Sequence, residues 1–326
     1  MNWKTTSLED LPLLQGCALK NAFFANNYGA VNSILYEKKF HSQIAVEEGW
    51  LFEKFTYGGE ICFAFPHFLR ESQQDGLLTG KEEVEAAVKE LLRSEARLES
   101  ASGKSLVFDN ILSEEKEILL RLFPSARSIQ RPESGDYVYR TQDLASLAGK
   151  KLSRKRNHIH QFQNKYADFS FETLNCDNLS YAQEIEEKWL LEAGKRGGKE
   201  SASSNLADDF LSDLQAEREI IISALKNFAD FEKEAGMGGG VLFVEKKPAA
   251  FCISSLLSER VTDVHFEKCL SPYARDGGYA VINNDFSKTV KTEFINREED
   301  LGLEGLRKAK LSYYPAMVLE KWRVEV

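Results

Sequence analysis

The sequence predicts an α/β fold built from two domains, and three observations support this. The chain has 326 residues, which is about two domains of ordinary size. Runs of alternating apolar residues are interleaved with runs in which apolar residues recur at helical spacing, as in a sheet covered by helices. The two halves repeat the same α/β order, so we expect domains at 1–145 and 146–326 that share one architecture.

The first domain opens with helices and then alternates strands with helices. Ser7 is a candidate cap for the opening helix, and Thr56–Gly59 is a hairpin turn between two strands. Val88 and Leu91 belong to the apolar stripe of an amphipathic helix, and Ser113 begins a capping box. The predicted helices cover 8–18, 29–36, 81–99 and 113–124, and the predicted strands cover 43–55, 60–66, 105–110 and 136–140.

The second domain begins with a basic helix. The Gly- and Ser-rich stretch 197–204 predicts a polar surface loop between two long helices. Lys246–Pro248 joins two alternating runs as a hairpin, and a third strand then leads to a turn that contains two glycines. The predicted helices cover 147–166, 181–196, 208–233, 278–289 and 303–312, and the predicted strands cover 168–174, 238–245, 249–257, 260–268, 292–296 and 319–326.

Composition argues against several classes of protein. With 43% hydrophobic and 29% charged residues, the chain is typical of a globular protein. Its net charge of −9 does not favour nucleic acid, so we expect no DNA partner. No apolar stretch is long enough for a membrane span, and the N-terminus lacks a signal-peptide layout. Five dispersed cysteines are typical of a cytoplasmic protein, and the histidines lack ligand spacing with them, so we expect no metal.

The stretch from Leu270 to Ala280 is the most informative part of the chain. A strand that leads through a glycine turn into a helix N-terminus can bind phosphate with its backbone N–H groups. Gly277 and Gly278 let the backbone approach a ligand, and Arg275 can add a charged contact. The alternative is an ordinary turn between a strand and a helix.

The same stretch resembles the pyrophosphate loop of the GNAT acyltransferases, V-x-P-x-x-R-x-x-G-x-G/A. Leu270, Pro272, Arg275, Gly278 and Ala280 fall on its five positions. The resemblance implies coenzyme A as the cofactor, with acyl-CoA as the donor. The cofactor-binding residues that it implies are Lys268, Cys269, Leu270, Arg275, Asp276, Gly277, Gly278, Tyr279 and Ala280.

Three ordered blocks resemble the DUF2156 family, whose domain also forms the C-terminal part of phosphatidylglycerol lysyltransferases. They are 149–162, 264–268 with 280–283, and 296–315. The resemblance implies two tandem GNAT-like domains, each with a mixed, mostly antiparallel sheet flanked by helices, and a coenzyme A site in the second. Its membrane-bound relatives transfer an aminoacyl group from tRNA to a lipid, whereas here we expect no membrane portion.

Direct acyl transfer to an amine needs a base for the amine and an acid for the leaving group. We expect Glu267 to be the base, and the alternative is an ion pair with Lys268 or Arg260. The GNAT resemblance implies Tyr313 as the acid, although Tyr313 or Tyr314 could instead pack between helix and strand. Candidate contacts for anionic substrate groups, although the pattern favours a solvated helix charge for each residue taken alone, are Arg154, Arg156, Lys308 and Lys310.

Three functions remain open from the sequence. The leading one is an acyl-CoA-dependent N-acyltransferase that acts on an unidentified amine. The second is an aminoacyl transferase that uses charged tRNA, which the basic stretch 150–156 favours and the net charge opposes. The third is a non-catalytic module that binds coenzyme A or another nucleotide.

Overall fold

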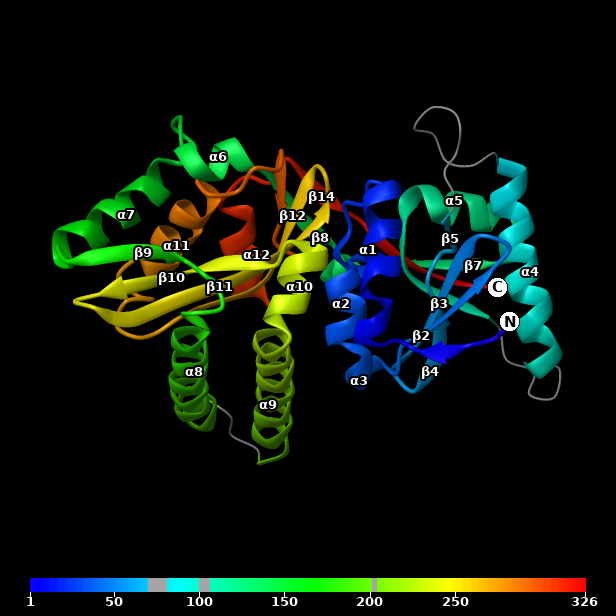
Figure 1. Ribbon diagram of the computed structural model, residues 1–326, viewed down its shortest axis with the longest axis horizontal. Coiled ribbons are helices and arrows are strands. Elements are labelled where there is room, and N and C mark those ends of the chain that lie inside the picture. The colour runs from blue at the N-terminus through cyan, green and yellow to red at the C-terminus, as the bar shows by residue number, and fades with distance from the viewer. Residues whose placement is uncertain (70–80, 100–105, 201–203) are drawn as a thin grey trace. The chain divides into compact units, whose positions relative to one another are not determined.

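A computed structural model describes residues 1–69, 81–99, 106–200 and 204–326 (Figure 1). The chain divides into two compact units. Each unit is made of segments that are not contiguous in the sequence, whereas the predicted domains were the continuous ranges 1–145 and 146–326. Unit 1 comprises Met1–Tyr137, Glu299–Arg307 and Val318–Val326, and unit 2 comprises Val138–Glu298 and Lys308–Met317. The chain returns to unit 1 because its last strand pairs with strands of that unit.

Unit 1 holds the first sheet and the helices that pack on it. Its elements, with β8 continuing into unit 2, are β1 (Lys4–Thr5), η1 (Leu8–Asp10), α1 (Leu11–Lys20), η2 (Asn26–Tyr28), α2 (Ala30–Leu35), α3 (Glu37–Phe40), β2 (Gln43–Glu47), β3 (Trp50–Tyr57), β4 (Glu60–Phe63), β5 (His67–Phe68), α4 (Lys81–Glu99), β6 (Val107–Leu112), α5 (Ser113–Leu122), β7 (Arg127–Gln130), η3 (Pro132–Ser134), β8 (Asp136–Arg140) and β15 (Lys321–Glu325).

The first sheet has the order β1-β2-β3-β4-β6-β15-β7, with β5 paired to β3. β4 and β6 run parallel and pair at Phe63 and Phe108, whereas the neighbouring pairs are antiparallel. Val88 and Leu91 of α4 are buried in one cluster with these two phenylalanines, as the predicted apolar stripe requires.

Unit 2 holds the second sheet. Its elements, of which α12 and β14 also include residues of unit 1, are α6 (Thr141–Ser146), α7 (Ser153–Lys165), β9 (Phe169–Thr173), α8 (Leu179–Glu200), α9 (Ser204–Lys226), α10 (Phe228–Ala235), β10 (Gly238–Val244), β11 (Lys247–Ser258), β12 (Val261–Cys269), α11 (Gly278–Ser287), β13 (Phe294–Asn296), α12 (Glu304–Leu311) and β14 (Met317–Leu319).

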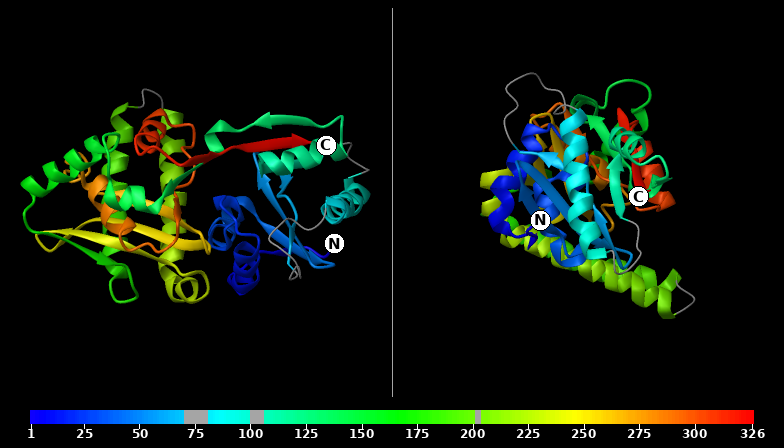
Figure 2. Two further views of the ribbon diagram at one scale, coloured as in Figure 1. Left: turned by 90° about the horizontal axis from the view of Figure 1, so that it is seen from above. Right: turned by 90° about the vertical axis from the view of Figure 1, so that its right-hand side faces the viewer.

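The second sheet has the order β14-β8-β13-β12-β11-β10-β9. β9 to β12 are antiparallel neighbours, β13 joins β12 in parallel, and β8 is antiparallel to β13. Helix α11 packs against β11, α6 and α7. The long helices α8 and α9 pack side by side and project away from this sheet (Figures 1 and 2). The prediction of mixed, mostly antiparallel sheets flanked by helices is therefore confirmed.

Several predicted elements differ from the structure. The strand predicted at 319–326 is β15, which pairs with β6 and β7 in the first sheet. The strand predicted at 136–140 is β8, which pairs with β13 in the second sheet. Strand β7 was not predicted. Of the loop predicted at 197–204, residues up to 200 continue α8, and 201–203 lie outside the described residues.

One predicted helix is shorter and another is divided in two, and in each case a side chain binds a backbone carbonyl at the boundary. The basic helix begins at Ser153, after left-handed turns at Leu147 and Gly149, whose carbonyl oxygens both accept hydrogen bonds from Arg156. The helix predicted at 208–233 is divided into α9 and α10 at Asn227, whose side-chain amide donates to the carbonyl of Ser223 at 2.9 Å.

Candidate active site

The candidate site lies where β12 and β13 stop pairing. Their parallel register covers Val261–Asp263 opposite Phe294–Asn296, and β13 ends there. β12 continues to Cys269, paired only with β11 in this fully described stretch. The two chains therefore separate, and the residues that follow β13 can face the second half of β12.

Arg297 and Glu267 bridge this separation. Nη2 of Arg297 lies 3.1 and 3.3 Å from the two carboxylate oxygens of Glu267, and both side chains are largely buried, with 14% and 13% of their surface exposed. The pairs that the sequence allowed for Glu267, with Lys268 or Arg260, are not the ones found: these two residues pair with Glu217 and Glu293.

The turn after β13 fixes the direction of Arg297. Glu298 is left-handed, with φ of 56°, and its N–H donates to Oδ1 of Asn296 at 2.7 Å. Nζ of the buried Lys310 donates to the carbonyl oxygens of Arg297 and Glu298 at 2.6 and 3.0 Å. A left-handed residue other than glycine persists only where such contacts hold it.

Two tyrosines form an aromatic wall beside the guanidinium. Arg297 lies 5.1 Å from the ring centre of Tyr313 and 5.9 Å from that of Tyr139. The hydroxyl of Tyr139 donates to the carbonyl of Lys310 at 2.8 Å, which holds its ring in place. Burial raises the pKa of Tyr313 to about 12, so its hydroxyl keeps its proton at neutral pH.

Lys155 of α7 completes the cluster. Its ammonium lies 3.8 Å from the ring centre of Tyr313, within the range of a cation–π contact. Burial, with a further contribution from Arg297, lowers the pKa of Lys155 to about 8. A lysine in this state is partly neutral near neutral pH, to a much greater degree than an exposed lysine.

The structure brings Glu267 and Tyr313 together and adds Arg297, Lys155 and Tyr139, which sequence reasoning missed. Lys155 lies in the basic stretch and Arg297 in the third DUF2156-like block, so both were within recognised segments. Only the position of Arg297 directly after a strand could have singled it out. Tyr314, the other tyrosine considered, is half exposed and contacts Lys151.

The glycine turn uses most of its backbone N–H groups internally. The N–H groups of Ala274, Arg275 and Asp276 donate to carbonyls of Leu270, Pro272 and Tyr273. Gly278 donates to Tyr273, and Ala280 and Val281 both donate to Gly277. In this arrangement the turn offers few donors to a phosphate, and a phosphate-binding role for it stays a prediction.

Close packing also explains both glycines. A Cβ at Gly278 would lie 2.6 Å from Sγ of Cys269 and 2.9 Å from the carbonyl oxygen of Tyr273. Gly277 is left-handed, and a Cβ there would lie 2.6 Å from the carbonyl oxygen of His158 in α7. The glycines therefore let the turn pack against the end of β12 and against α7.

The other predicted cofactor residues make contacts within unit 2. Lys268 pairs with Glu217 at 2.7 Å and lies 3.8 Å from the ring centre of Trp189. Asp276 accepts hydrogen bonds from Lys165 and Tyr166. Burial raises the pKa of Cys269 far above its usual range, which makes it a poor nucleophile.

At the start of the turn, the N–H of Leu270 donates to the carbonyl oxygen of Ala249. The side chain of Arg275 is exposed. Burial raises the pKa of the Tyr279 hydroxyl to about 12.

Two of the four basic residues predicted to contact a substrate bind backbone carbonyls instead. Arg156 and Lys310 hold backbone carbonyls, as described above. Arg154 and Lys308 are exposed on different helices, α7 and α12. A role in anion binding stays a prediction for Arg154 and Lys308.

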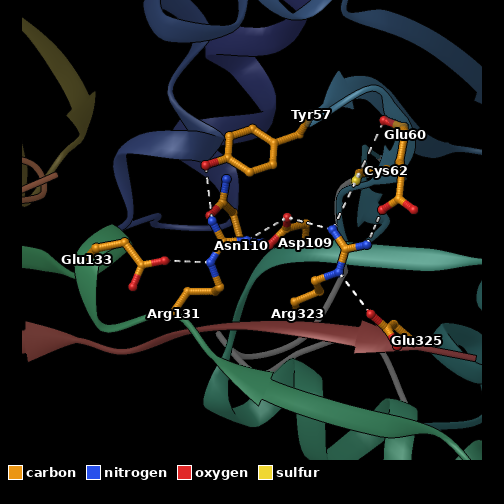
Figure 3. A network of polar contacts seen from close by, with 9 residues as sticks. All are labelled: Tyr57, Glu60, Cys62, Asp109, Asn110, Arg131, Glu133, Arg323 and Glu325. Atoms are coloured by element: carbon orange, nitrogen blue, oxygen red, sulfur yellow. Dashed lines mark hydrogen bonds and ion pairs between the residues drawn. The ribbon is translucent and has the colours of Figure 1, made fainter. Parts of the chain in front are cut away.

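Unit 1 has a comparable strand separation, and a network of charged residues occupies it (Figure 3). Asp109 follows the single parallel pair of β4 and β6, and Asn110 is left-handed with φ of 58°, as Glu298 is in unit 2. Asp109 is buried and lies 3.2 Å from Arg131 and 3.6 Å from Arg323.

The two arginines of this network have further partners. Arg131 donates to Glu133 at 2.7 Å and to the hydroxyl of Tyr57 at 3.1 Å. Arg323 donates to Glu325 at 3.1 Å and also to Glu60. This position in unit 1 is stabilised by mutual ion pairs, so unit 2 is the better candidate for chemistry.

Comparison with known proteins identifies the family. The family model for the C-terminal domain of phosphatidylglycerol lysyltransferase matches residues 76–325. The chain belongs to this family. A conserved protein of unknown function from Bacteroides thetaiotaomicron is 28% identical, with a TM-score of 0.82 over 100% of this chain and 99% of that one.

A second solved structure supports the fold. It is the C-terminal DUF2156 domain of a putative lysylphosphatidylglycerol synthetase from Agrobacterium fabrum, with 12% identity and a TM-score of 0.62 over 97% of this chain and 91% of that chain. An uncharacterized protein of Mycoplasmoides gallisepticum, MYCGA3080, is 22% identical over 194 residues, which are 59% of this chain and 56% of the relative. The chain thus aligns with about half of that curated relative. Among the described residues, no helix is both long and apolar enough to cross a bilayer.

Proposed function

We propose that this family member is an acyltransferase that moves an aminoacyl group from its ester on tRNA to an amine acceptor. The observation that carries the proposal is the cluster of Lys155, Glu267, Arg297 and Tyr313 at the separated ends of β12 and β13. It combines a fixed positive charge, a protonated phenol and a lysine of lowered pKa, which are the groups that acyl transfer needs.

Each residue has a role in the proposed reaction. The neutral amine of Lys155 takes the proton of the acceptor nitrogen as that nitrogen attacks the acyl carbonyl carbon. Arg297 stabilises the negative charge that develops on the carbonyl oxygen. The C–N bond forms, the ester C–O bond breaks, and Tyr313 gives its proton to the leaving ribose oxygen. Lys155 then returns a proton to the tyrosinate.

Glu267 acts on this reaction through Arg297. Because both of its carboxylate oxygens face the guanidinium, it is better suited to orient Arg297 than to remove a proton from the acceptor. We therefore assign the base to Lys155 and keep the acid at Tyr313.

Two observations favour an aminoacyl ester over acyl-CoA. The turn expected to hold the pyrophosphate already uses the N–H groups of Ala274–Asp276, Gly278 and Ala280 within itself. The family model that matches the chain is named for a lysyltransferase, whose name describes transfer of an amino acid. Coenzyme A stays the alternative donor, and the two are separable by experiment.

The test presents both donors to the intact protein. In one assay the protein is incubated with tRNA that carries a mixture of labelled amino acids, and in the other with acetyl-CoA. Ethanolamine is the probe acceptor in both. We expect the protein to release label from tRNA faster than the reaction without protein does, at a rate that falls steeply as the salt concentration rises. We expect no release of free coenzyme A above background. Consumption of acetyl-CoA alone would reverse the assignment of the donor, and turnover of neither donor would overturn acyl transfer.

A further inference from the structure

We infer that Asp263, His265 and Glu298 form a binding site for a divalent cation of the zinc class. Asp263 and His265 belong to β12, and Glu298 follows β13. One ligand atom from each residue lies within 4.8 Å of the other two. The site is in unit 2 and consists of residues other than those of the proposed reaction cluster, although Glu298 directly follows Arg297, and the inference does not depend on the proposed function.

The two distances from the histidine nitrogen to the carboxylate oxygens fit tetrahedral zinc. Nδ1 of His265 lies 3.3 Å from Oε1 of Glu298 and 3.7 Å from Oδ2 of Asp263. Zinc bonds to nitrogen and oxygen are about 2.0–2.2 Å long, so two ligands of a tetrahedron lie about 3.3–3.6 Å apart. Octahedral magnesium, with bonds of about 2.0–2.1 Å, would bring neighbouring ligands to about 2.9 Å. The observed spacing is closer to the tetrahedral value.

The strand geometry aims His265 at the carboxylates. The register of β12 against β11 passes from Val264 opposite Ser254 to Phe266 opposite Ile253, so His265 is the extra residue of a β-bulge. Bulges often redirect a side chain next to a functional site. Asp263 and His265 are two residues apart, a spacing that places strand side chains on one face, so the bulge changes the angle between them and does not by itself create the pairing.

Ser255 provides the outer contact that a zinc-binding histidine usually has. Its Oγ lies 2.8 Å from Nε2 of His265. When Nε2 donates to this hydroxyl, Nδ1 carries its lone pair toward Asp263 and Glu298. Such outer partners fix the tautomer and orientation of the ligand.

Burial gives a reason for a cation here. The side chains of Asp263 and His265 are each 1% exposed, and that of Glu298 is 14% exposed. Placing two carboxylates beside one imidazole at this depth is costly unless a positive charge is shared among them. We infer that a divalent cation supplies this charge. The alternative is the tautomer in which Nδ1–H donates to Oε1 of Glu298 and Nε2 accepts from Ser255, and the experiment separates the two.

The experiment titrates the intact protein with zinc chloride, after dialysis against a chelator, and follows heat and thermal unfolding. A Cys176→Ser background removes the exposed thiol, since the other cysteines are buried. We expect one zinc ion per chain, a higher unfolding temperature with zinc than with magnesium, and a four-coordinate absorption spectrum with cobalt.

Variants decide whether this site is responsible. Asp263→Asn and Glu298→Gln should each remove tight binding, and Ser255→Ala should weaken it by about 10–100-fold. Glu293→Gln, which changes an exposed carboxylate paired with Arg260, should bind zinc like the parent protein. Absence of binding would leave the contact between Nδ1 of His265 and Glu298 as an ordinary hydrogen bond and overturn the inference. Equal binding by all variants would indicate an adventitious ion only, with the same consequence.

Discussion

Arg297 and Glu267 face each other across the point where β13 ends and β12 continues, 3.1 and 3.3 Å from nitrogen to the two oxygens. Neither strand alone would place these charges together. The parallel pairing of three residues on each strand does so, and Lys310 holds the turn from which Arg297 extends.

The ion pair should be important for stability because both partners are largely buried. Arg297→Met leaves the carboxylate of Glu267 without its partner, and breaking such a pair typically costs about 3–5 kcal/mol of unfolding free energy. The double variant Arg297→Met/Glu267→Gln should recover part of this loss. Arg260→Met, in an exposed pair with Glu293, should cost less than about 1 kcal/mol. Denaturant unfolding of the parent protein and the three variants measures these losses, and equal losses for Arg297→Met and Arg260→Met would contradict the prediction.

The pH dependence of the transfer rate should report Lys155. Its pKa is lowered to about 8, so the neutral amine accumulates as the pH rises through that value, and the rate should rise with it. Because Arg297 contributes to lowering this pKa, Arg297→Met should move the rise to higher pH as well as slow the reaction. A pH–rate profile of each protein measures the shift. If the midpoint of the pH–rate profile is unchanged in Arg297→Met, the group that titrates is not Lys155.

Gly278 should resist substitution for reasons of packing. A Cβ there would lie 2.6 Å from Sγ of Cys269, and Gly278→Ala should lower the unfolding free energy by about 1–3 kcal/mol. Gly305, an exposed helical glycine with no atom within 4 Å of a Cβ, is the matched control. Gly305→Ala should be neutral or stabilising by up to about 1 kcal/mol. Equal unfolding free energies for Gly278→Ala and Gly305→Ala would show that a Cβ fits at Gly278 and would contradict the prediction.

Glu186 should make unit 2 less stable as the pH rises. This fully buried carboxyl group has no hydrogen-bond partner for either oxygen among the described residues, and burial raises its pKa from 4.5 to about 7. Between these values the folded state keeps a proton that the unfolded state releases, so the contribution to stability is lost as the pH rises through that window. Glu186→Gln should therefore be more stable than the parent protein at pH near 8, and similar at pH near 4.5. Unfolding curves at both values check this, and a gain of the same size at each pH would refute it.

Local patterns predicted most elements but not their partners. The alternating run at 319–326 indicates a strand, but nothing in it shows that the strand joins the first sheet between β6 and β7. The basic helix begins later than predicted because Arg156 binds two carbonyls in the preceding turn. Both facts depend on residues that lie outside the local pattern.

The site was predictable only in part for the same reason. Glu267 lies near the end of a predicted strand and Tyr313 follows a predicted helix, and the structure brings them to one cluster with Arg297 between them. Arg297 was missed because its relation to Glu267 depends on the register of β12 and β13. The glycine turn matched a phosphate-binding pattern. Its glycines are also required by close packing, and the sequence pattern does not distinguish the two reasons.

The most direct test of the proposed chemistry compares Lys155→Met with Lys151→Met in single-turnover transfer from aminoacyl-tRNA to ethanolamine. Lys151 is an exposed lysine in the same basic stretch, so both variants carry the same substitution, and enzyme in saturating excess over the tRNA keeps any loss of tRNA binding out of the measured rate. The account predicts a rate lower by about 10²-fold or more for Lys155→Met, the usual size of a general-base effect, and a nearly unchanged rate for Lys151→Met. Equal rates for the two variants would contradict it.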